Sequence, residues 1–141
     1  MDAPIYLHLK PGDAPPQLDS FVPFKAVVVV ESDVTPEWQA EISAWLVQSG
    51  CRYMSAWGNN CSGWDDSVDW AALEMFDFGD IPLDGFVMTS LHENASLEET
   101  FWFCGHNAHH PSLDLRATYI VHIAQEARES ELSALFLAAQ V

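Results

Sequence analysis

The chain has 141 residues, 49% of them hydrophobic, and carries 21 acidic against five basic side chains, for a formal net charge of -16. This composition is typical of a packed globular domain and excludes a disordered chain. The negative charge repels nucleic acid and anionic lipid, so it argues against both as partners and favours a basic one.

The compartment follows from the termini and the cysteines. The first residues lack the charged start and apolar core of a signal peptide, and no apolar run reaches the roughly 20 residues that span a bilayer. The three cysteines, Cys51, Cys61 and Cys104, are odd in number and irregular in spacing. We therefore expect reduced thiols in a cytoplasmic protein, with a Cys51–Cys61 disulfide as the alternative.

The first half of the chain predicts two strands and a helix. Residues 5–10 alternate apolar and polar side chains, which indicates a half-exposed edge strand, and a proline-rich loop follows over residues 11–23. Residues 26–30 are a β-branched run, typical of a strand buried on both faces. Thr35 is the expected N-cap of a helix that ends at Gly50.

The second half repeats the same rhythm. A strand is predicted over residues 52–57, followed by a helix that Ser62 caps, with Asp65 and Asp66 in its first turn. Residues 86–91 predict a third buried strand, and Ser96 opens a capping box for the next helix. A fourth strand over residues 115–123 precedes a last helix capped by Ser130.

Strand and helix alternate four times after the edge strand. This order predicts one α/β domain over residues 1–141, a three-layer sandwich with a mostly parallel sheet of four or five strands and helices on both faces. Residues 1–24 supply the edge strand and the proline-rich loop.

The loops after the strands should meet at one edge of the sheet, where ligands of such folds bind. Asp33, Cys61, His92 and Glu93 lie in these loops, and His92–Glu93 is the best acid–base pair for a small hydrolase-like enzyme. The alternative is that His92 and Glu93 only begin a loop. No glycine-rich phosphate loop occurs, so no nucleotide cofactor is expected.

One short segment concentrates side chains that can bind metal. Cys104, His106, His109 and His110 lie within seven residues at a helix end, without a partner pair nearby in the sequence. Zinc sites use paired ligands on separate rigid elements, so we expect no bound metal here.

The most distinctive segment is both aromatic and acidic. Between Arg52 and Arg116 there are eleven acids and no lysine or arginine. The expected contacts of a basic partner in this region are Trp64, Asp65, Asp66, Asp69, Trp70, Asp77 and Asp80. Tryptophans supply large contact areas and acids select a basic partner. In the structural alternative Trp64 is a staple before the helix, Trp70 packs inside, and Asp65 and Asp66 interact with the helix dipole.

Three segments of the chain resemble a family of small bacterial proteins of unknown function. They are residues 49–58, the WDDSVDW sequence at 64–70, and His92-Glu93 followed by Leu97-Glu-Glu-Thr-Phe-Trp-Phe103. The resemblance implies a bacterial, cytoplasmic, single-domain protein and assigns no catalytic residue.

Three functions remain open from the sequence. The favoured one is an acidic protein-binding module of the immunity or inhibitor type, which neutralises a basic partner such as a bacterial toxin. The alternative is the hydrolase-like enzyme at the strand ends. A homo-oligomeric scaffold is the third, although like charges oppose it, and the sequence does not determine the oligomeric state.

Overall fold

The computed structural model describes residues 3–18 and 22–141. Its strands are β1 (Ile5–Leu9), β2 (Phe24–Val30), β3 (Cys51–Gly58), β4 (Met88–Leu91) and β5 (Ala117–Ile123). They form one sheet in the order β1-β5-β2-β3-β4, with every neighbouring pair parallel. The helices are α1 (Pro36–Ser49), α2 (Cys61–Met75), α3 (Leu97–His106) and α4 (Glu129–Ala139), with the 3-10 turn η1 at Leu83–Gly85.

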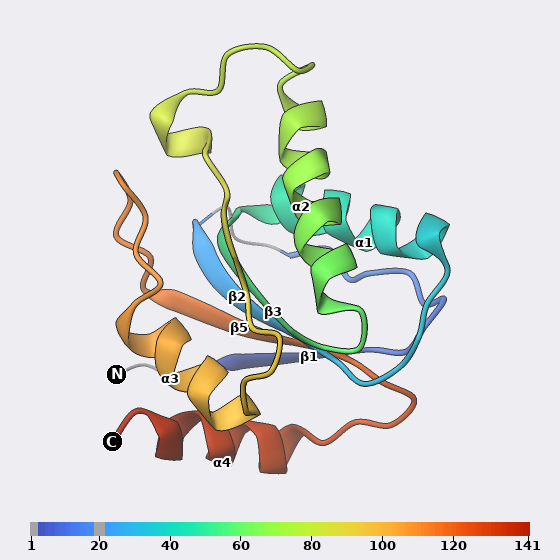
Figure 1. The fold of residues 1–141 in the computed structure, drawn as a ribbon, viewed down its shortest axis with the longest axis vertical. Coiled ribbons are helices and arrows are strands. Elements are labelled where there is room, and N and C mark those ends of the chain that lie inside the picture. The colour runs from blue at the N-terminus through green and yellow to red at the C-terminus, as the bar shows by residue number, and fades with distance from the viewer. Residues whose placement is uncertain (1–2, 19–21) are drawn as a thin grey trace.

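The sheet is covered on both faces. Figure 1 shows α1 and α2 on one side of it and α3 and α4 on the other. Along β2, Ala26, Val28 and Val30 pack towards α1 and α2, whereas Val27 and Val29 pack towards α3 and α4. This alternation explains why the strand is apolar throughout, because a strand with two covered faces has no solvent side. The predicted three-layer α/β sandwich is confirmed.

Two of the four predicted helix caps are present. Thr35 Oγ1 accepts a hydrogen bond from the Trp38 N–H at 3.2 Å, and Ser96 Oγ accepts one from the Glu99 N–H at 3.0 Å. These bonds satisfy amide groups that lack partners inside a helix.

The predictions for Ser62 and Ser130 were wrong. Helix α2 begins at Cys61 after Asn60, and α4 begins at Glu129 after Arg128, in both cases without a side-chain cap. The backbone at Asn60 is left-handed, with φ of 52°, and this reverses the chain before α2. As a result Asp65 lies beyond the first helical turn, and the helix dipole does not explain the acid there.

Strand β4 also differs from its prediction as a buried strand. It is shorter than residues 86–91, and it lies at the edge of the sheet, paired only with β3. Met88 and Leu91 are 38% and 42% exposed. The apolar sequence therefore forms surface rather than core.

Three indole groups fix loops to the sandwich. Trp38 Nε1 donates to the Asp13 carbonyl at 2.9 Å, and Trp45 Nε1 donates to the Pro16 carbonyl at 2.8 Å. Trp57 Nε1 donates to the Ala95 carbonyl at 2.8 Å, just before α3. The predicted loop at 11–23 is thereby held against α1, although its residues 19–21 lie outside the described part of the chain.

The end of β3 requires glycine. Gly58 has φ of 101°, and a Cβ atom there would collide with the Val30 carbonyl of β2. Only glycine adopts this backbone conformation and allows the two strand ends to come so close. In the described ranges, no helix has both the length and the apolar character needed to cross a membrane.

Candidate functional site

The sequence-predicted residues Asp33, Cys61, His92 and Glu93 follow β2, β3 and β4. Because these strands are parallel, the residues lie at the same edge of the sheet. Asp33 lines a cavity of about 250 Å³ together with Asn59, Asn60 and Trp64. In the described part of the chain no hydrogen bond connects His92 to Glu93 or to Asp33. The shared edge fits the sequence, but the acid–base pair is not assembled.

Cys61 and His92 have environments that suppress charge. Cys61 is 6% exposed, and its burial, followed by the nearby Glu93 carboxylate, raises the pKa of the thiol. Burial lowers the pKa of His92, whose ring packs against Phe103 at 4.7 Å between centroids. His92 Nε2 lies 2.8 Å from Ser90 Oγ. A protonated thiol is a poor nucleophile, so Cys61 is unsuited to covalent catalysis.

The Cys104–His110 segment is occupied by local bonds. Cys104 is fully buried, and the Lys25 ammonium group donates to its backbone carbonyl at 2.6 Å. His110 uses Nε2 on the Phe86 carbonyl at 2.8 Å and accepts the Ser112 N–H at Nδ1. Among the residues that the structure describes, no three His, Cys, Asp or Glu side chains are grouped to hold a metal ion. That this segment binds no metal stays a prediction.

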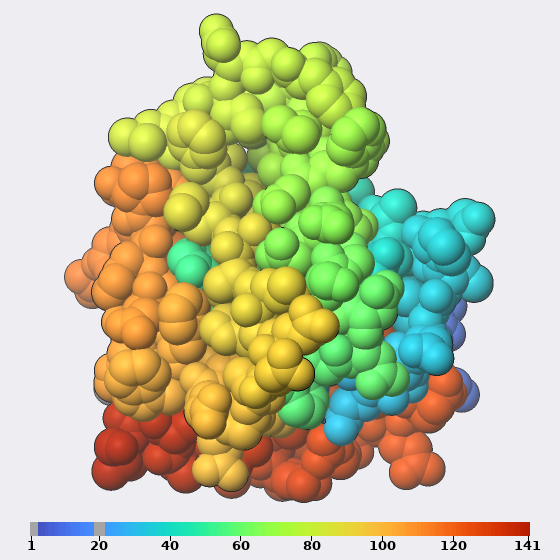
Figure 2. Space-filling model, in the orientation of Figure 1, coloured from blue at the N-terminus to red at the C-terminus, as the bar shows by residue number. Residues whose placement is uncertain are grey.

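A different surface carries the strongest combination of charge and apolar area. We call it the acidic–apolar face, formed by α2, residues 76–87 and β4, which lie together in Figure 2 as green, yellow-green and yellow. Its exposed apolar side chains are Trp70, Leu73, Phe78, Leu83, Phe86, Met88 and Leu91. Its exposed acids are Asp66, Asp69, Glu74, Asp77, Asp80 and Asp84.

Two aromatic rings contact each other on this face. Trp70 and Phe78 are each 57% exposed, and their rings meet edge to face with centroids 5.2 Å apart. Trp70 Nε1 also donates to Glu74 Oε1 at 2.5 Å. By contrast Trp64 has no exposed surface and packs at right angles to Trp38 in the core. Trp64 therefore supports the face from beneath and cannot touch a partner.

The acids of α2 influence one another. Burial raises the pKa of Asp69, and the nearby carboxylates of Asp65 and Asp66 raise it further, against a hydrogen bond from Thr89 Oγ1 at 2.9 Å. Asp65 is half-buried, and its Oδ1 has no hydrogen-bond partner among the described residues. A raised pKa means that the anionic form of Asp69 is disfavoured here, and an external cation would relieve this cost.

Cations are scarce around the acidic–apolar face. In the described ranges, no lysine, arginine or histidine forms an ion pair with any of its acids. Arg52, which contacts this face at Asp84, donates to the backbone carbonyls of Val47, Cys51 and Asp84. Its charge therefore stabilises backbone rather than neutralising a carboxylate.

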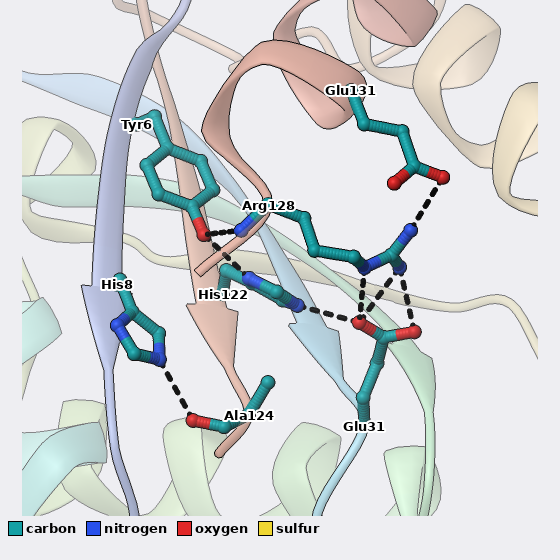
Figure 3. A network of polar contacts seen from close by, with 7 residues as sticks. All are labelled: Tyr6, His8, Glu31, His122, Ala124, Arg128 and Glu131. Atoms are coloured by element: carbon teal, nitrogen blue, oxygen red, sulfur yellow. Dashed lines mark hydrogen bonds and ion pairs between the residues drawn. The ribbon is translucent and has the colours of Figure 1, made fainter. Parts of the chain in front are cut away.

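A second polar cluster joins the carboxyl ends of β2 and β5 to the start of α4 (Figure 3). His122 of β5 is fully buried, with its Nδ1 2.6 Å from the Tyr6 hydroxyl and its Nε2 2.5 Å from Glu31 Oε1. Arg128 Nη2 donates to both Glu31 oxygens at 2.7 Å, and the Arg128 backbone N–H donates to the Tyr6 oxygen at 2.9 Å. Tyr6 lies in β1 and His122 in β5, whereas Glu31 directly follows β2 and Arg128 directly precedes α4.

The charge states of Glu31 and His122 assign the protons in this cluster. The lowered pKa of Glu31 keeps its carboxylate ionised, so His122 Nε2 donates to it. Nδ1 of a neutral imidazole then accepts the Tyr6 hydroxyl proton, while the Tyr6 oxygen accepts the Arg128 N–H. Burial lowers the pKa of His122, which favours this neutral imidazole. Burial opposes ionisation of Glu31, but the hydrogen bonds from Arg128 and His122 prevail and lower its pKa. Every partner is satisfied without a ligand.

This cluster occupies the point where the chain leaves the sheet in opposite directions. After β2 it enters α1 on one face, and after the neighbouring β5 it enters α4 on the other. Open α/β sheets bind ligands in the crevice at such a point. Here the Glu31–Arg128 ion pair occupies this point and connects the end of β2 to the start of α4, and we call this cluster the latch.

Comparison with known protein families identifies one that spans nearly the whole domain. A family model described as a domain of unknown function (DUF7684) matches residues 4–139. The chain belongs to this family. No curated protein and no solved structure matches it.

The latch of this DUF7684 domain was missed from the sequence. The available signal was His122, a polar residue within the apolar run 119–123 of a buried strand. A buried imidazole needs hydrogen-bond partners, and these had to come from neighbouring strands. The exposure of Phe86, Met88 and Leu91 on the acidic–apolar face was missed because residues 86–91 were assigned to the core.

Proposed function

We propose that this domain is a protein-binding module whose acidic–apolar face takes up a basic protein partner. The observation that supports it best is the pairing of Trp70 and Phe78, both more than half exposed, with carboxylates that form no ion pair among the described residues. Contiguous exposed apolar surface marks interaction sites. Aromatic anchors supply binding energy, while a surrounding rim of charge raises the association rate.

The type of partner follows from the charge. An enzyme that acts on anionic substrates has a cationic active site, and a compact acidic domain can cover such a site. We therefore propose an inhibitor or immunity role towards a basic protein such as a bacterial toxin. The three cysteines are free, as a reducing cytoplasm would keep them.

The test begins with isolation of the protein from its native host together with its bound partner. The purified partner is then measured against the wild type, Trp70→Ala and Trp102→Ala by surface plasmon resonance. Trp102 is the matched control, because it is 46% exposed on α3, outside the acidic–apolar face. We expect Trp70→Ala to weaken binding by roughly 30-fold, the effect of a hot-spot residue worth about 2 kcal/mol.

The control separates a local contact from general loss of aromatic surface. Trp102→Ala should bind within about twofold of the wild type, since a difference that small lies below 0.5 kcal/mol. Equal binding by both variants, or a larger loss in Trp102→Ala, contradicts the proposal.

A second candidate is the hydrolase-like activity, supported by one contact. Ser90 Oγ and His92 Nε2 are 2.8 Å apart, within range for proton transfer from a serine hydroxyl to a neutral imidazole. This candidate requires that ester hydrolysis by the purified protein disappear in Ser90→Ala and His92→Ala. Activity that persists in both variants belongs to a contaminant and removes the candidate.

A further inference from the structure

We propose that β4 is the docking edge of the acidic–apolar face, and that it accepts an extended segment of the partner in which lysine or arginine alternates with apolar residues. This inference rests on the proposed function and specifies how the partner binds. In such binding the added segment becomes a sixth strand of the sheet, held by main-chain hydrogen bonds.

The backbone of β4 offers these bonds on its outer side. The His92 N–H donates to the Ala56 carbonyl of β3 at 3.0 Å, and Ser90 is in register with Ser55. Backbone groups alternate in direction along a strand, so Ser90 shares the direction of His92, while Thr89 and Leu91 point theirs away from β3. Among the described residues, neither Thr89 nor Leu91 has a backbone partner outside its own strand pair.

The outer edge is also accessible. Figure 2 shows the yellow segment that contains β4 at the surface, between green α2 and the orange residues that follow α3. The exposure of Met88 and Leu91 agrees with this view. An open edge with apolar side chains is the usual template for pairing with another chain.

The side chains beside β4 determine the chemistry of the segment. On one face of the strand Thr89 is bonded to Asp69 of α2, so alternate side chains of an added strand would pass close to that carboxylate. Lysine and arginine suit this row, since their stems cover Leu91 while their charges reach the acids. On the other face Met88 and Ser90 are neutral, which favours apolar residues in the second row.

The same charges disfavour a second copy of the chain as the occupant. Two β4 edges in contact would bring the carboxylates beside this strand, among them Asp69, close together on two copies that each carry a net charge of -16. Like charges directly opposite one another destabilise strand pairs. The edge is therefore blocked to itself and open to a cationic strand.

The experiment uses an acetylated peptide of alternating lysine and valine. Amide hydrogen exchange is followed by NMR in the full-length protein. At a peptide concentration about ten times its Kd, exchange of the Thr89 and Leu91 amides should slow roughly tenfold. The Ser90 amide is the internal control, because it already faces β3. A peptide with N-methyl groups on alternate residues should give no such protection.

Two variants test the same edge independently. Leu91→Pro removes the outward N–H, and Leu91→Ala removes only side-chain surface. We expect Leu91→Pro to bind the peptide up to about tenfold more weakly than Leu91→Ala, the value of one lost hydrogen bond. Proline is tolerated on an edge strand where its N–H would face solvent. If Leu91→Pro fails to fold, the exchange measurement on the wild type decides alone.

The outcomes separate this inference from the proposed function. Peptide binding that shifts the Trp70 and Asp69 resonances without protecting the Thr89 or Leu91 amides overturns strand addition. The proposal that the acidic–apolar face binds a basic partner would still stand. Absence of peptide binding also overturns it, while the isolated partner still tests the proposed function. Protection of Thr89 and Leu91 that grows with protein concentration alone would assign the edge to self-association instead.

Discussion

Replacing Glu31 by glutamine should destabilise the fold by about 2 kcal/mol, because this carboxylate is the centre of the latch. Its Oε1 accepts a hydrogen bond from the buried His122 Nε2 at 2.5 Å, and both of its oxygens accept from Arg128 Nη2 at 2.7 Å. Glutamine keeps the shape and one acceptor oxygen, but it loses the charge and turns an NH₂ group towards the guanidinium group. Arg128 then keeps a charge without its main partner.

The magnitude follows from how far solvent reaches the pair. Hydrogen bonds to charged groups contribute about 1.5–3 kcal/mol, whereas fully exposed ion pairs contribute about 0.2–1 kcal/mol. The side chain of Glu31 is only 32% exposed and also receives the buried His122, so its loss falls within the first range, at about 2 kcal/mol. For a chain of this length 2 kcal/mol lowers Tm by roughly 6–8 °C.

Glu131→Gln is the matched control for this measurement. Glu131 contacts the same Arg128 at 2.7 Å, but its side chain is 65% exposed. Its loss should cost about 0.5 kcal/mol or less. Both variants and the wild type are unfolded in urea at pH 7.5 and by calorimetry. Equal, small changes in the two variants would refute the latch, because burial and the bond to His122 would then contribute nothing.

Two further predictions concern acid sensitivity and the tryptophans. The pKa of His122 is lowered in the fold, so the unfolded chain binds more protons below about pH 6.5 and the free energy of unfolding must fall there until the folded pKa is passed. Urea titrations from pH 7.5 to 5 should show this loss of stability. His122→Gln should reduce the dependence of the free energy of unfolding on pH without removing it, since burial also lowers the pKa of His92. An unchanged pH dependence in His122→Gln would contradict the role given to His122. Trp64→Ala should cost about 3–5 kcal/mol and Trp70→Ala under about 1 kcal/mol, because only Trp64 is buried; comparable losses would place both side chains in the core.

The layered fold was predictable because its signals are local. The β-branched run of β2, the Thr35 cap and the Ser96 cap each depend on residues a few positions apart. Ser62 and Ser130 were wrongly predicted as N-caps because the same local signal, a serine followed by residues typical of a helix, occurs at both positions. Helix α2 instead begins at Cys61, after a backbone reversal at Asn60 that requires no hydroxyl group.

The strand order depends on contacts distant in sequence. Strand β5 inserts between β1 and β2, which places His122 beside Tyr6 and Glu31, 116 and 91 residues away. Nothing local distinguishes an apolar edge strand from a central one, so residues 86–91 were expected in the core. Of the predicted partner residues, Trp70 and Asp69 are exposed together, while Trp64 is buried beneath them.

The central claim is that the acids of α2 bring a basic partner to the acidic–apolar face. The most direct test compares the association rate of the isolated partner with Asp66→Asn/Asp69→Asn and with Glu98→Gln/Glu99→Gln over a range of salt concentrations. Both double variants remove two exposed charges, but Glu98 and Glu99 lie in the first turn of α3. We predict that only the α2 variant associates more slowly and with a flatter salt dependence. The same rate and salt dependence in both double variants would contradict the claim, because the charge would then act without regard to its position.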